Sequence, residues 1–181
     1  MDQIALGHLF EFRQPLRYDC SMALRIASAT ERDLPLILTF IKKLAEYEKL
    51  SHVVVATEDL LRDALFGPRP VAEVILAYWN DEPVGFALFF HNFSTFLGRR
   101  GIYLEDLFVD PPHRGNGIGK ALLIHLAKIA KERNCGRFDW AVLDWNKPSI
   151  EFYKSLGAVP LDDWTLFRLT GDPLDRLVGS G

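Results

Sequence analysis

The spacing of apolar residues changes along this chain, and the changes predict which segments are helices. Between Leu34 and Leu44 the apolar residues recur every three or four positions, which is typical of a helix with one buried face. The same spacing returns from Ile118 to Ile129. Residues that favour helix ends mark the start and the end of two shorter helices, 58–66 and 149–156. The four predicted helices are 34–48, 58–66, 118–134 and 149–156.

Segments rich in aromatic and β-branched residues predict strands between these helices. Residues 80–83 form a hairpin-type connection, so the sheet begins antiparallel, and 92–100 is interpreted as a polar loop. The helix that begins at Ile118 forms a crossover between two strands, which therefore run parallel. The predicted strands are 24–27, 71–78, 84–90, 103–109 and 138–143, with terminal strand material in 158–169. The fold class is therefore mixed α/β, with a central mixed sheet, largely antiparallel with one parallel pair, flanked by about four helices.

One stretch, from Tyr103 to Lys120, joins a strand to a turn and then to a helix. The prolines after Asp110 end the strand, because proline cannot donate to a sheet ladder. Gly115, Gly117 and Gly119 then fall at the helix start, where free N–H groups and the positive end of the helix dipole favour an anion. Phosphate is the expected anion.

Two common phosphate loops do not fit this stretch. A Walker loop requires Ser or Thr after its lysine, but Ala121 follows Lys120. The dinucleotide fingerprint requires its third glycine three places after the second, and here it comes after two. What remains is Arg-Gly-x-Gly-x-Gly after a Val-Asp-Pro turn. This pattern resembles the pyrophosphate loop of the GCN5-related N-acetyltransferases (GNAT), which bind acetyl-coenzyme A.

Three separated segments extend the resemblance to one branch of that family. They are 41–48 (IKKLAEYE), 103–109 (YLEDLFV) with its glycine loop, and 145–153 (WNKPSIEFY). They resemble the diamine and polyamine N-acetyltransferases, which include the spermidine/spermine and thialysine enzymes, and the resemblance covers about residues 24–169. It implies a GNAT-type sheet whose parallel pair lies at the cofactor site, a small cationic amine as acceptor, and a homodimer.

The resemblance also implies a role for individual residues. Tyr153 would protonate the departing thiolate, and Asn146 and Ser149 would hold coenzyme A near its thiol end. The remaining cofactor-binding residues would be Leu107, Phe108, Val109, Arg114, Gly115, Asn116, Gly117, Ile118 and Gly119. The acceptor-binding residues would be Tyr47, Glu48, Glu105, Asp106 and Trp164.

Acetylation of an amine requires a general base, and Glu105 and Asp106 are candidates for this role. A free amine is protonated at neutral pH, so a base must accept its proton before the nitrogen attacks the thioester. Glu105 is the first candidate for that base, directly or through a water, and Asp106 is the second; a cross-strand salt bridge is the structural alternative for Glu105. A regular strand would turn the two carboxylates to opposite faces, so we predict a β-bulge between Glu105 and Phe108. A main-chain N–H left unpaired near Phe108 could stabilise the oxyanion.

Composition and charge argue against several classes of protein, among them nucleic-acid-binding and membrane proteins. The chain has 181 residues with a net charge of −3, which argues against nucleic acid as a partner and suits a cationic substrate. No apolar run is long enough to predict a membrane span. Cys20 and Cys135 show no metal or redox spacing, so we expect no metal and a cytoplasmic location. Residues 1–21 read as an N-terminal extension or a remnant of cloning, and 22–181 as one acetyltransferase domain.

Two other functions fit parts of the pattern. A protein or peptide N-acetyltransferase would have an open, neutral acceptor groove in place of an acidic one. A non-catalytic sensor of acyl-coenzyme A would keep the glycine loop but would not need Tyr153 or the Glu105–Asp106 pair. The sequence does not identify the amine acceptor.

Overall fold

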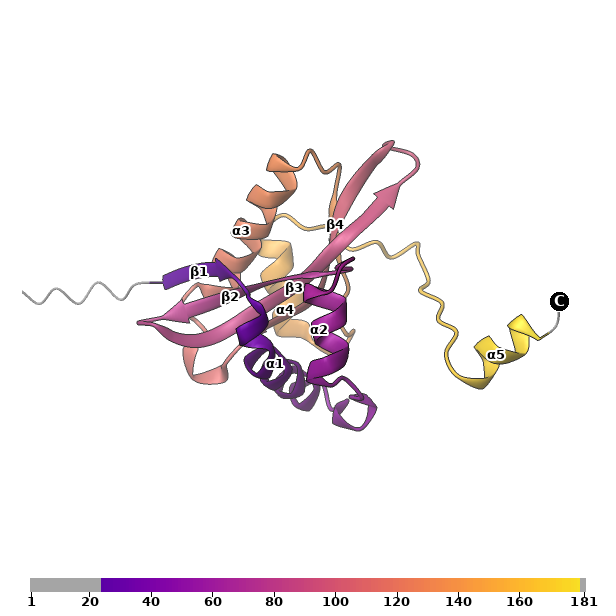
Figure 1. Cartoon of the computed structure of the whole chain (residues 1–181). Helices are drawn as coiled ribbons and strands as arrows, with labels where there is room; N and C mark the ends of the chain where they lie inside the picture. Colours follow the sequence, from indigo (N-terminus) through magenta and orange to yellow (C-terminus); the bar gives the residue numbers. More distant parts are fainter. Residues whose placement is uncertain (1–23, 180–181) are drawn as a thin grey trace, which may run out of the picture. The chain divides into compact units, whose positions relative to one another are not determined.

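The computed structural model describes residues 24–179 (Figure 1). The chain divides after Trp140 into two compact units. The first unit ends with the last strand of the sheet, and the second begins at Ala141. The predicted extension 1–21 and the domain start at Met22 lie outside the described residues.

The first unit is built on a five-stranded mixed sheet with the strands in chain order. Neighbours among the first four strands are antiparallel, and β4 and β5 are parallel. The strands are β1 (Leu24–Ser28), β2 (Glu73–Trp79), β3 (Glu82–Ser94), β4 (Arg99–Val109) and β5 (Phe138–Trp140). This arrangement confirms the predicted mixed sheet with one parallel pair.

Helices cover both faces of this sheet (Figure 1). On one face, α1 (Leu34–Tyr47) and α2 (Glu58–Phe66) pack against alternate residues of β2, β3 and β4. Phe40 of α1 lies over Phe86 with 5.6 Å between the ring centroids, and Phe108 belongs to the same core. On the other face, α3 (Ile118–Glu132) contacts β3 and β4 through the buried stripe that includes Leu122 and Leu126.

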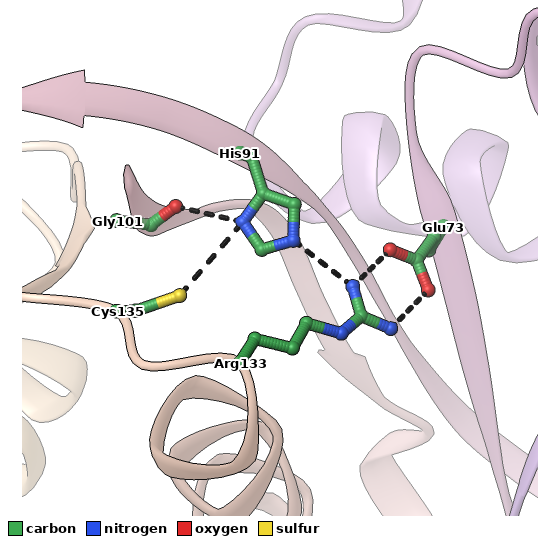
Figure 2. Close-up of polar contacts among 5 residues, drawn as sticks. All are labelled: Glu73, His91, Gly101, Arg133 and Cys135. Carbon is green, nitrogen blue, oxygen red and sulfur yellow. Dashed lines mark hydrogen bonds and ion pairs between the residues drawn. The ribbon is translucent and has the colours of Figure 1, made fainter. Parts of the chain in front are cut away.

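A polar network fastens the C-terminal end of α3 to the sheet (Figure 2). Arg133 donates two hydrogen bonds to the carboxylate of Glu73 on β2, and its Nη1 also lies 3.0 Å from His91 Nε2. His91 Nδ1 lies 2.9 Å from the carbonyl oxygen of Gly101, which can only accept. His91 therefore carries its proton on Nδ1 and accepts from Arg133 with Nε2. The thiol of Cys135 lies 3.9 Å from Nδ1 at the edge of the network.

The second unit consists of helices and irregular chain. It contains α4 (Lys147–Ser155) and α5 (Asp172–Val178), and α5 was not predicted. The prediction of terminal strand material in 158–169 is wrong, because the structure forms no strand there. A strand requires a hydrogen-bonding partner, and the described part of this unit contains none.

The predicted loop at 92–100 is also wrong, because β3 and β4 continue through most of it. His91 pairs with Ile102 and Asn92 with Gly101, so only 95–98 remain as the turn of a long hairpin. The predicted strand at 138–143 is shorter than expected and ends at Trp140.

Candidate active site

A β-bulge lies in the middle of β4. Leu104 pairs with Phe89 and Asp106 pairs with Leu88, so Glu105 has no opposite residue on β3. We predicted a bulge between Glu105 and Phe108, and the structure puts it at Glu105, the first residue of that interval. Residues paired across a sheet share a face, so Asp106 lies on the side of Leu88, where α1 and α2 pack.

Three carboxyl groups gather beside the bulge, and we call Glu48, Glu105 and Asp106 the carboxylate group. Burial, together with the negative charges of Glu105 and Glu48, raises the pKa of Asp106 to about 7. Glu48 follows the last residue of α1, and partial burial raises the pKa of its carboxyl as well. A bound cation would relieve both the repulsion and the desolvation, so the group suits an ammonium.

The glycine loop that follows β4 has the backbone of an anion site. Gly115 and Gly117 have φ of 82° and 78°, in the left-handed region that favours glycine. Gly117 is the N-cap residue of α3, and no side chain caps this end of the helix. Asn116 Nδ2 donates to the carbonyl oxygen of His113 at 3.1 Å and holds the loop in shape. The first N–H groups of α3 therefore have no side-chain cap, which is the arrangement that suits an anion.

Arg114 is held against the protein and does not extend freely into solvent. Its Nε donates to the carbonyl oxygen of Val109 at 2.9 Å. Its guanidinium carbon lies 4.6 Å from the ring centroid of Tyr47 and 5.7 Å from that of Phe108. The side chain is therefore oriented before any ligand arrives.

The end of β4 has one edge without a strand beside it. Its pairing with β5 covers only 102–104, so within the described residues the outer edge of 105–109 has no strand partner. The N–H of Asp110 bonds to the carbonyl oxygen of Val84, so by the alternation of an antiparallel ladder Phe108 also directs its main-chain groups to β3, whereas Leu107 and Val109 direct theirs to the open edge. Leu107 and Val109 can therefore offer main-chain groups to an extended ligand. The side chains of Phe108 and Ile118 are buried in the core, so Ile118 can reach a ligand only through its main chain.

Four predicted site residues belong to the second unit. Asn146 is the buried N-cap of α4, and its Oδ1 accepts from the N–H of Ser149 at 3.4 Å. Tyr153 lies one turn after Ser149 on the same helix, and its ring packs against Phe152. Trp164 lies in irregular chain with an exposed fraction of 77%. That these residues join the carboxylate group and Arg114 in one site stays a prediction.

Two contacts at the C-terminal half of α1 were missed from the sequence. Lys43 Nζ lies 2.8 and 3.0 Å from the carboxylate oxygens of Asp110, and Tyr47 lies beneath Arg114. Lys43 and Tyr47 are four residues apart and share a helix face, which is the one signal that could have linked them. Their partners follow β4, more than sixty residues later, and nothing local indicates that approach.

Within residues 24–179 no group of three or more His, Cys, Asp or Glu side chains could hold a metal ion. The expectation of no metal stays a prediction. None of the helices in this part of the chain is long and apolar enough to cross a membrane.

A model of the acetyltransferase (GNAT) family matches residues 41–158, so the chain belongs to this family and is an acetyltransferase. It is 41% identical to a thialysine N-epsilon-acetyltransferase of Mus musculus, over 86% of this chain and 97% of the relative. It is 33% identical to the L-ornithine N5-acetyltransferase NATA1 of Arabidopsis thaliana, over 84% of this chain and 87% of the relative.

A solved structure shares the fold. An integron cassette protein from the mobile metagenome of V. cholerae superposes with a TM-score of 0.72 at 32% identity, covering 87% of this chain and 98% of that protein. These relatives confirm the resemblance to the diamine and polyamine branch and the GNAT-type fold class.

Proposed function

We propose that this enzyme transfers acetyl from acetyl-coenzyme A to a primary amine of a small cationic acceptor, by direct transfer within one ternary complex. The observation that carries the proposal is the position of Glu105 and Asp106, two members of the carboxylate group, on the strand that leads into the glycine loop. A site for a cation and a site for a phosphate therefore lie at the two ends of one short segment. That combination suits an amine acceptor and a nucleotide thioester.

The residues of the glycine loop fit the diphosphate of coenzyme A. The uncapped N-terminus of α3, the left-handed Gly115 and Gly117, and the guanidinium of Arg114 supply N–H groups and positive charge. Leu107 and Val109 would bind the pantetheine arm through the open edge of β4, and Phe108 is assigned to the cofactor through the family resemblance. Asn146 and Ser149 are assigned to the thiol end through the family resemblance.

The carboxylate group fits a cationic acceptor. Glu48 and Asp106 would pair with an ammonium, and Tyr47 would line the same end of α1. The relatives' names place the acetyl group on a side-chain nitrogen, N-epsilon of thialysine in one and N5 of L-ornithine in the other. Lysine analogues and diamines are therefore the acceptors we favour, and Trp164 is assigned to the mouth of this site.

Glu105 and Tyr153 would transfer the protons of the reaction. Glu105 would accept a proton from the attacking ammonium, directly or through a water, which frees the lone pair on nitrogen. The thioester supplies an activated acetyl carbonyl. The new C–N bond forms at that carbonyl carbon, whose oxygen becomes negative and is stabilised by a main-chain N–H near Phe108. The C–S bond then breaks, and Tyr153 would donate its hydroxyl proton to the thiolate. The second proton of the attacking nitrogen, lost as the amide forms, would pass through water to the tyrosine oxygen and restore the hydroxyl.

The test is thiol release from acetyl-coenzyme A with a panel of amines. We expect turnover with diamines or lysine analogues and little with peptides that bear a free N-terminus or lysine. Preference for peptides would favour a protein N-acetyltransferase. Saturable binding of the cofactor without turnover on any amine would favour a sensor.

A Tyr153→Phe variant tests the proposed acid. It should lower turnover by about 100-fold while the affinity for coenzyme A stays nearly unchanged. Tyr78→Phe removes the same hydroxyl from β2 and serves as the matched control, with no change expected in turnover. Full turnover in Tyr153→Phe would remove this residue from the mechanism.

We also propose that the enzyme acts as a homodimer, and its cytoplasmic location stays a prediction. Support for the dimer comes from apolar side chains of the second unit, among which Val159, Trp164 and Phe167 are between 77% and 88% exposed. A second copy of the chain would remove such side chains from water. Light scattering after size exclusion should give the mass of two chains, and the mass of one chain at micromolar concentration would contradict the proposal.

A further inference from the structure

The ring of Tyr47 lies beneath the guanidinium of Arg114, and this contact joins two parts of the site that are distant in sequence. The guanidinium carbon is 4.6 Å from the ring centroid, within the range of a cation–π interaction. The Nε–H is used by the carbonyl oxygen of Val109. A guanidinium has five N–H donors, so four remain on the two Nη atoms for a ligand.

We infer that Tyr47 is a positioning residue for the cofactor, because it orients the guanidinium of Arg114 toward the phosphates. The inference rests on the proposed function, in which the glycine loop binds the diphosphate of coenzyme A. It adds to the acceptor-side role that the family resemblance gives Tyr47.

The need for such a contact follows from the loop itself. Arg114 is exposed and is followed by Gly115 in a left-handed conformation, so its immediate neighbours in sequence give it little support. An arginine side chain loses substantial rotamer freedom when it is fixed in one geometry. Stacking on Tyr47 and the Nε bond to Val109 restrict the side chain in advance, so less freedom is lost when the phosphate binds.

The end of α1 that carries Tyr47 is itself fixed to the strand that leads into the loop. Lys43 lies one turn earlier on α1 and pairs with Asp110 at 2.8 Å, directly after the end of β4. Glu48, the next residue after Tyr47, belongs to the carboxylate group through its charge effect on Asp106. One helix end therefore carries both the ring that contacts Arg114 and one member of the carboxylate group.

The test compares Tyr47→Leu with Tyr47→Phe by calorimetry with coenzyme A. The leucine variant should bind coenzyme A about 3- to 30-fold more weakly, since a cation–π contact is lost, whereas the phenylalanine variant keeps the ring and should bind within about twofold of the wild type. Tyr78→Leu is the matched control. The ring centroid of Tyr78, on β2, lies 3.9 Å from the guanidinium carbon of Arg25, on β1, so this tyrosine also stacks with an arginine. The control variant should leave the affinity for coenzyme A unchanged.

Two further measurements separate positioning from general damage. In an Arg114→Ala background, Tyr47→Leu should cause no additional loss of affinity for coenzyme A. With S-acetylpantetheine, a donor that lacks the diphosphate, Tyr47→Leu should leave the KM for the donor unchanged. Equal weakening in the presence and absence of Arg114, or an equal rise of the pantetheine KM, would overturn the inference.

The outcomes also distinguish this inference from the proposed function. Wild-type protein that binds no coenzyme A would end the proposed function and this inference together. Wild-type protein that binds coenzyme A normally, with a Tyr47→Leu variant that binds it equally well, would end only the inference.

Discussion

Arg133 and Glu73 join the end of α3 to the first residue of β2 through a two-pronged ion pair, with Arg133 Nη2 2.8 Å from Glu73 Oε2 (Figure 2). The pair also orients the N–H that Arg133 donates to His91. The network of Arg133, Glu73 and His91 therefore links three strands to one helix on the α3 side of the sheet. An isolated surface ion pair would join only two elements.

This ion pair predicts how the free energy of unfolding depends on pH. The hydrogen bond from Arg133 lowers the pKa of Glu73 in the folded protein, so the pair stabilises the fold above the unfolded value of 4.5, and the stabilisation is lost as pH falls through the lowered pKa. The Glu73 side chain is 46% exposed, so we expect Glu73→Gln to cost only about 1 kcal/mol at pH 7. Denaturant unfolding from pH 7 to pH 3 measures this cost, which should shrink as the pH falls below 4.5.

The control for Glu73→Gln is Asp81→Asn. Asp81 is 93% exposed and 3.7 Å from Arg25, so its loss should change the free energy of unfolding by a few tenths of a kcal/mol or less. If Glu73→Gln costs no more than this control at pH 7, the network does not stabilise the end of α3.

Removal of Glu105 separates the fold from the chemistry. Leu104 and Asp106 pair with adjacent β3 residues, so deletion of Glu105 would leave a regular ladder with every other residue on its present face. We expect the deletion variant to fold with an unfolding free energy within about 1 kcal/mol of wild type, because no core residue changes face. Acetyl transfer should fall by at least about 100-fold, since the carboxylate and the bulge are both lost.

Glu105→Gln keeps the bulge and removes only the charge. A fall in turnover similar to that of the deletion would assign the effect to the carboxylate. A much smaller fall would assign it to the shape of the strand. Circular dichroism and denaturant unfolding check that each variant is folded, and an active deletion variant would contradict both roles.

Local signals allowed some elements to be predicted well. The bounds predicted for α2, Glu58–Phe66, are those observed, because its N-cap is local: Thr57 Oγ1 accepts from the N–H of Leu60 at 3.3 Å. The bulge was predicted from a conflict within the strand itself, since Glu105 and Asp106 could not share a face without it.

Features that depend on distant partners could not be predicted from local signals. The extension of β3 and β4 through 92–100 rests on pairing across the hairpin, and the polar sequence of that stretch conceals it. The segment 158–169 has strand-like composition but no strand partner among the described residues of its unit. The stacking of Tyr47 with Arg114 joins residues 67 positions apart and leaves no local pattern.

Substitution of Gly117 tests the backbone of the glycine loop. Its φ of 78° is strained for alanine, and no atom lies within 4 Å of the added Cβ, so the cost to stability is conformational and about 1 kcal/mol. Gly98, at the hairpin turn, has φ of 60° and equal space, and Gly98→Ala is the matched control. Both variants should lose a few degrees of Tm, but only Gly117→Ala should lose about tenfold in affinity for coenzyme A. Equal affinities in calorimetry would contradict the loop assignment.

Asp106 should make the fold less stable as the pH rises. Its pKa is raised to about 7 in the folded protein, first by burial and then by Glu105 and Glu48, so the native state binds more protons than the unfolded state between about pH 4 and pH 7. The free energy of unfolding should therefore fall across this window and level off above it. Asp106→Asn cannot ionise and should be more stable than the wild type at pH 8, by an amount on the order of 2 kcal/mol. Equal stability of the two proteins at pH 8 would contradict the burial of this charge.

The ionisation of Asp106 should also control the affinity of the enzyme for its amine acceptor. Between pH 6 and pH 8 a primary amine stays protonated, with a reference pKa near 10, whereas Asp106 passes from mostly neutral to mostly ionised. The affinity for a diamine, measured by calorimetry with coenzyme A bound, should rise about tenfold over this range because the ammonium gains a charged partner. Asp106→Asn should bind the diamine weakly with no such rise, and the exposed Asp81→Asn should keep the wild-type profile. A flat profile in the wild type, or an unchanged rise in Asp106→Asn, would remove Asp106 from the acceptor site.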